Sequence, residues 1–125
     1  MRAPKRVLLR FAVAVGCTDD DLERGDRLAR ERRWTEAVDA YKQAIDKDPH
    51  HYQAAFGIAR IYCHEVHFAD KCLAWTDRLL AAYPRRAEYR RAAAQGHRDR
   101  AAAARERGDE ATAQTEEAKA AELDR

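Results

Sequence analysis

Apolar residues recur at helical spacing in two runs along the chain, and each run ends at a proline. The first run stops at Pro49, and the second stops 35 positions later at Pro84. Side chains three or four positions apart share one face of a helix. The members of the two runs are Trp34, Ala37, Val38, Tyr41, Ala44 and Ile45, and then Ala69, Cys72, Leu73, Thr76, Leu79 and Leu80. A self-similar period of this length predicts two copies of one helix-turn-helix unit.

Turn residues and possible caps divide each copy into two helices. The first helix is expected to start at one of the aspartates 19–21 and to end near Arg32, with Thr35 as the N-cap of the second. The third should begin near His51 or Tyr52, and the fourth should run from Phe68 to about Tyr83. The turn of the second copy holds one extra residue, and we expect residues 63–67 to fill it.

After Pro84 the composition changes, because large apolar side chains become rare and alanine becomes common. Residues 85–107 are rich in arginine, whereas residues 110–124 are mainly acidic. Gly108 and Asp109 between them have the pattern of a helix stop followed by an N-cap. These residues predict a third, degenerate hairpin that caps the two repeats. Alanine faces bury little area, so its contribution to the core should be small.

The two copies resemble the tetratricopeptide repeat, whose pattern is W-x2-L-G-x2-Y, then A-x3-F, then P. The first copy supplies Gly25, Leu28, Ala37, Tyr41 and Pro49, and the second supplies Ile58, Ala59, Tyr62, Cys72, Thr76 and Pro84. Asp21 and Arg24 stand where the pattern has Trp and Leu. The resemblance implies an all-α fold, a short solenoid of two recognisable hairpins followed by the degenerate one. It also implies binding to other proteins and no chemistry of the fold's own.

Residues 1–17 match a bacterial lipoprotein signal peptide in outline. A basic start and a short apolar run precede Ala14-Val15-Gly16-Cys17, which resembles a lipobox. The resemblance implies cleavage before Cys17, lipidation of its thiol, and a place in the cell envelope, with the outer membrane facing the periplasm as one destination. Arg10 interrupts the apolar run, and a charge there opposes insertion. The alternative is a basic N-terminal extension of a cytosolic protein. The predicted parts are therefore 1–17, 18–84 and 85–125.

The partner site implied by the resemblance is a concave groove lined by the first helix of each hairpin. A protein or peptide would contact the outward stripes, and Phe56 is the best single anchor because exposed aromatic residues carry much of the energy at interfaces. Packing of Phe56 against the next hairpin is an equal alternative. The stripes comprise Leu22, Asp26 and Ala29 in the first copy, and Phe56, Arg60 and Cys63 in the second.

Two cysteines and two histidines around the second turn are of metal-binding types. They are Cys63, His64, His67 and Cys72. No regular zinc spacing is present, and Cys72 takes the small-residue packing position of the repeat, so a packed cysteine and a polar turn are the simpler interpretation. Cys63 and Cys72 could also form a disulfide in an oxidising compartment. A metal- or redox-responsive module is therefore the less favoured alternative function, and no cofactor is predicted.

The chain of 125 residues has a formal charge of +2, and its basic excess comes largely from residues 1–17. The arginines of 85–107 surround their helix rather than forming one stripe, which argues against nucleic acid. No nucleophile motif or phosphate-binding loop is present, so no enzyme is predicted. The sequence thus predicts a protein-binding scaffold or adaptor, with membrane contact only through Cys17. Because repeat arrays usually need three units, a homodimer is also possible.

Overall fold

The computed structural model describes residues 20–125, and all regular secondary structure in that range is helical. The chain divides into two compact units, Met1–Ala54 and Ala55–Arg125. Helix α3 (Tyr52–Arg60) contains the boundary between them. The predicted lipobox and Cys17 lie outside the described residues. No helix in residues 20–125 is long and apolar enough to cross a membrane.

The first unit contains a helical hairpin made by residues 20–30 and α2 (Trp34–Lys47). Gly25 allows the two helices to approach, because a Cβ there would lie 2.5 Å from Cε1 of Tyr41. The Tyr41 ring is fully buried, and its hydroxyl donates a hydrogen bond to Asp26 Oδ1 at 2.5 Å. The small and large residues of the first repeat therefore pack as the sequence pattern requires.

A backbone motif, rather than a side chain, closes this hairpin. Arg32 has a φ of 61°, and the N–H groups of Arg32 and Arg33 donate to the carbonyls of Ala29 and Leu28 at 3.0 and 2.9 Å. These are the two bonds of a Schellman turn. Arg33 is then the N-cap of α2, and the prediction of Thr35 for this role was wrong. The Arg33 carbonyl already accepts from Ala37 at 2.9 Å, so the helix starts one residue before Thr35.

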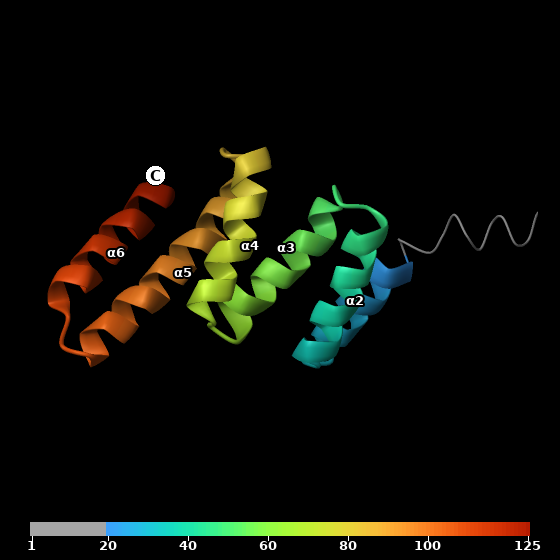
Figure 1. The fold of residues 1–125 in the computed structure, drawn as a ribbon, viewed down its shortest axis with the longest axis horizontal. Helices are drawn as coiled ribbons and strands as arrows, with labels where there is room; N and C mark the ends of the chain where they lie inside the picture. The colour runs from blue at the N-terminus through green and yellow to red at the C-terminus, as the bar shows by residue number, and fades with distance from the viewer. Residues whose placement is uncertain (1–19) are drawn as a thin grey trace, which may run out of the picture. The chain divides into compact units, whose positions relative to one another are not determined.

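The second unit contains the rest of α3, a π-helical turn η1 (Ile61–Glu65), and α4 (Ala69–Ala82). Two longer helices follow, α5 (Ala87–Glu106) and α6 (Glu110–Leu123). Helix α4 packs against α5, and α5 lies side by side with α6 (Figure 1). The predicted third hairpin is therefore present. Gly108, with a φ of 78°, ends α5, and the Asp109 carboxylate caps α6 by accepting from the Thr112 N–H at 3.1 Å.

Small side chains form much of the core of the second unit. A Cβ added to Gly96 would lie 2.7 Å from Cys72 Sγ, which shows how closely α5 approaches α4. Further along, Ala101 and Ala104 of α5 pack with Ala113 of α6. Because these contacts bury few methylene groups, polar interactions supplement them between α5 and α6. Arg90 donates to the last carbonyls of α6, and Arg98 pairs with Asp124 at 2.8 Å.

Candidate functional site: a disulfide-held turn and its groove

The extra residue in the second repeat is accommodated in η1. Residues 61–65 form a π-helix, in which the Val66 N–H donates to the Ile61 carbonyl at 2.9 Å. Such turns insert one residue into a helix. The expectation that residues 63–67 form the turn was therefore wrong for its first three members, which remain helical. The non-helical turn is confined to Val66, His67 and Phe68.

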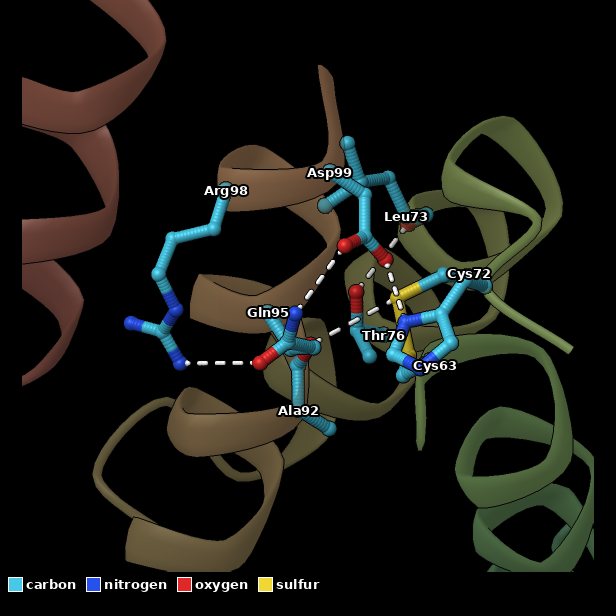
Figure 2. Close-up of a disulfide and its surroundings, with 9 residues drawn as sticks. Cys63, Cys72, Leu73, Thr76, Ala92, Gln95, Arg98 and Asp99 are labelled. Atoms are coloured by element: carbon cyan, nitrogen blue, oxygen red, sulfur yellow. Dashed lines mark hydrogen bonds and ion pairs between the residues drawn. A yellow bond between two sulfur atoms is a disulfide. The ribbon is translucent and has the colours of Figure 1, made fainter. Parts of the chain in front are cut away.

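Cys63 of η1 and Cys72 of α4 form a disulfide, with an S–S distance of 2.06 Å and a Cα–Cα distance of 4.8 Å. Both residues are fully buried. Figure 2 shows the bond facing α5, where Cys72 Sγ lies 3.5 Å from the Ala92 carbonyl oxygen. A disulfide sulfur carries no proton, so this is a packing contact rather than a hydrogen bond. The bond closes a short segment that includes the whole turn.

Polar contacts hold the turn against α5. His67 has a φ of 53°, and its Nδ1 lies 2.9 Å from an oxygen of Asp99. The other Asp99 oxygen accepts from the side-chain amide of Gln95 at 3.0 Å, and Arg98 donates to Gln95 Oε1 at 3.3 Å (Figure 2). Through His67, this chain of contacts ties the turn to α5.

The four predicted metal-type residues do not form one site. Two of their side chains are the sulfurs of the disulfide, which are not thiolate ligands. His67 pairs with Asp99, and His64 is exposed. Within residues 20–125, no group of three or more metal-binding side chains comes together. With both sulfurs in the disulfide, Cys63 and Cys72 cannot supply the thiolate ligands that the metal interpretation requires.

The two predicted groove stripes fall in different units. In the first unit Leu22, Asp26 and Ala29 are half-buried, and Asp26 is engaged by the Tyr41 hydroxyl. In the second unit the Phe56 ring packs 5.1 Å from the Tyr89 ring, so the packing alternative describes its position. Arg60 is exposed and stacks over Phe56 at 5.5 Å. Cys63 is fully buried in the disulfide and cannot line an open groove.

A different groove lies beside the disulfide-held turn, and sequence reasoning missed it. It is an open hollow of about 490 Å³, bounded by the turn, the start of α4, the C-terminal half of α5 and the first half of α6. We call it the turn groove; it is lined by Val66, His67, Phe68, Ala69, Asp70, Asp99, Arg100, Ala103, Arg107, Thr112 and Glu116. The available signal was an apolar pair, Val66 and Phe68, in an otherwise polar connection. The positions of α5 and α6 beside it could not be read from the sequence.

A family model described as tetratricopeptide repeat matches residues 28–96, more than half of the chain. The chain belongs to the tetratricopeptide repeat family. Proteins of this family typically bind other proteins and generally have no catalytic activity. Neither the comparison with curated proteins nor that with solved structures gives a match. The family and the all-α fold of this tetratricopeptide repeat chain are therefore established.

Proposed function

We propose that this tetratricopeptide repeat protein is a bacterial envelope lipoprotein that acts as a non-catalytic scaffold for another protein. The membership of the family supports the binding role, and Cys17 in the lipobox-like sequence supports the anchor. Cys17 would be the sole point of membrane contact, so residues 18–125 would be presented to the partner at the membrane surface.

The Cys63–Cys72 disulfide is the observation that favours the envelope. Disulfides persist in the periplasm and in other oxidising compartments, whereas cytosolic reductants keep most thiols reduced. Both sulfurs are fully buried against α4 and α5, so the bond is built into the packing of the second unit. The first repeat has Ala29 and Ala37 at the corresponding positions, so the repeat pattern itself does not demand cysteine there.

A cytosolic adaptor is the alternative, and Arg10 within the apolar run favours it. In that case residues 1–17 are a basic extension and the two thiols remain reduced. The two proposals place the same interaction fold in different compartments.

Membrane partition with a matched pair of variants separates the two. We expect the wild-type chain, expressed in a bacterium, to sediment with membranes and to incorporate labelled palmitate. Cys17→Ser should abolish both properties, whereas Cys63→Ala/Cys72→Ala should leave lipidation unchanged. Equal amounts of the wild type and Cys17→Ser in the soluble fraction, with no label in either, would contradict the envelope proposal.

A further inference from the structure

The turn groove combines exposed apolar side chains with charged ones. Val66 and Phe68 are 41 % and 49 % exposed, and both line it. We propose that the turn groove docks a short peptide segment of the partner protein, one in which an aromatic or aliphatic side chain lies close to an acidic residue. This proposal rests on the proposed protein-binding function and assigns it a site and a ligand chemistry.

The charge of the ligand follows from which groove residues already have partners. Each acidic residue of the groove is engaged: Asp70 with Arg100 at 2.9 Å, Asp99 with His67 at 2.9 Å, and Glu116 with His97 at 2.6 Å. The first of these pairs also uses the positive charge of Arg100. The groove walls therefore contain several charges that are satisfied within the second unit.

Arg107 differs from these paired charged residues of the groove. Within residues 20–125 its side chain forms no ion pair or hydrogen bond, although it lines the groove. Its charge contributes to holding the pKa of Asp109 below the ordinary value, behind the larger effect of the hydrogen bonds from Thr112. That carboxylate is already occupied as the cap of α6. A carboxylate on the ligand would give Arg107 a partner of its own, at the edge of an apolar contact.

The Phe68 ring is held in place before any ligand arrives. The Phe68 N–H donates to the Tyr62 carbonyl at 2.8 Å, and its carbonyl accepts from Cys72 at 2.9 Å. The ring meets Tyr62 edge-on at a centroid distance of 6.2 Å, and Lys71 Nζ lies 5.1 Å above it. An aromatic side chain that is both exposed and fixed loses little entropy on binding.

The disulfide also restricts the conformation of the turn that carries Val66 and Phe68. Cys63 and Cys72 lie on either side of Val66 and Phe68 in the sequence, so the bond limits the conformations of the segment that presents them. In this account the disulfide preorganises the apolar wall of the groove. Reduction should weaken ligand binding without touching Arg107.

Selection from a random peptide library tests the proposal. The purified full chain, with its disulfide formed, is panned against phage-displayed peptides, and enriched peptides are synthesised for fluorescence anisotropy. We expect enriched sequences to contain an aromatic or aliphatic residue near Asp or Glu. Phe68→Ala should weaken their binding about tenfold or more, as for truncation of an aromatic hot spot. Tyr83→Ala, at a similarly exposed aromatic residue outside the groove, is the control.

A charge-reversal variant tests the role of Arg107 more directly. Arg107→Glu should weaken binding of the acidic peptide about tenfold. A peptide in which Lys replaces the acidic residue should bind this variant again. Arg91→Glu, at an exposed position of α5 outside the groove, controls for net charge. Circular dichroism of each variant checks that the fold is retained.

Any one of the following outcomes would overturn the docking proposal. The library could yield no enriched peptide, the enriched peptides could lack an acidic residue, or Arg107→Glu could act no more strongly than Arg91→Glu. Enriched peptides that bind the groove variants normally would place the ligand elsewhere on the chain, and the protein-binding function would stand. Failure of membrane partition concerns only the compartment and leaves the groove untouched.

Discussion

Gly96 determines how closely α5 packs against α4 in the second unit. Its missing side chain leaves room for Cys72 Sγ and for Leu73, whose Cγ and Cδ2 would each lie 3.0 Å from an added Cβ. These neighbours are buried, and Cys72 is held by the disulfide, so neither can move away freely. The glycine is therefore a packing requirement rather than a source of backbone flexibility.

Gly96→Ala should lower the free energy of unfolding by about 1–3 kcal/mol, because overpacking forces neighbouring groups to shift. Urea unfolding measures the change. Ala102→Ser, at an exposed position of the same helix, should cost no more than about 0.5 kcal/mol. Equal stability of Gly96→Ala and the wild type would show that the two helices do not approach as described.

Glu116 gives the docking of α6 a dependence on pH. Burial would raise the pKa of its carboxyl, but the hydrogen bond from His97 and the nearby charge of Lys119 outweigh it and hold this pKa below the ordinary value. The ionised carboxylate therefore stabilises the fold above the ordinary pKa of a glutamate. This contribution is lost as the pH falls through the lower folded-state pKa.

Glu116→Gln should accordingly destabilise the protein near neutral pH, and the difference from the wild type should shrink as the medium becomes acidic. Thermal unfolding of both proteins between neutral pH and about pH 3 measures this, since that range spans the ordinary glutamate pKa. His97→Asn, which removes the ring donor, should reduce the same pH-dependent difference. A difference in Tm between the wild type and Glu116→Gln that stays constant across this pH range would contradict this account.

Among the elements, η1 shows where sequence reasoning succeeds and where it stops. The spacing between Tyr62 and Cys72 revealed one residue more than in the first repeat, but a longer turn and an inserted helical residue satisfy that count equally. The structure places the insertion in the helix, and this positions Cys63 opposite Cys72. Helix periodicity cannot decide this, because the outcome depends on which side chains α5 brings alongside.

Several helices were predictable: α2 and α4 have apolar periodicity and end just before Pro49 and Pro84, and α5 ends just before Gly108. The candidate site was not. Phe56 has the spacing of an exposed groove residue, yet Tyr89 from a later helix covers part of it. The sequence predicts Phe68 at the start of α4, where the structure has it as the N-cap. That its ring is exposed depends on the conformation of the turn, which the sequence does not show.

Removing the disulfide should weaken the second unit without unfolding the chain. For Cys63→Ala/Cys72→Ala we expect a loss of about 2–3 kcal/mol, the usual effect of opening a loop of this short length. Alanine is the residue that the first repeat has at these positions, so the backbone can accept it. Urea unfolding of this variant and of the reduced wild type should give similar midpoints. Wild-type midpoints that are identical with and without reductant would contradict a structural role.

At the scale of the whole molecule, two features concern the compartment: Cys17 in the lipobox-like sequence and the Cys63–Cys72 disulfide. They are chemically independent, since one concerns processing and the other packing. Both are expected in a bacterial envelope lipoprotein, and neither is needed by a cytosolic tetratricopeptide repeat adaptor. The partner-binding account requires only the family and the fold, whereas the envelope account requires both cysteine modifications.

The intact mass of the protein purified without reductant from its native membranes tests the central proposal most directly. The account predicts residues 17–125 carrying a diacylglyceryl group, and a mass that rises by two hydrogens when Cys63 and Cys72 are reduced. Thiol alkylation under denaturing conditions should modify these cysteines only after reduction. An unmodified full-length chain in the soluble fraction, with all three thiols free, would contradict it.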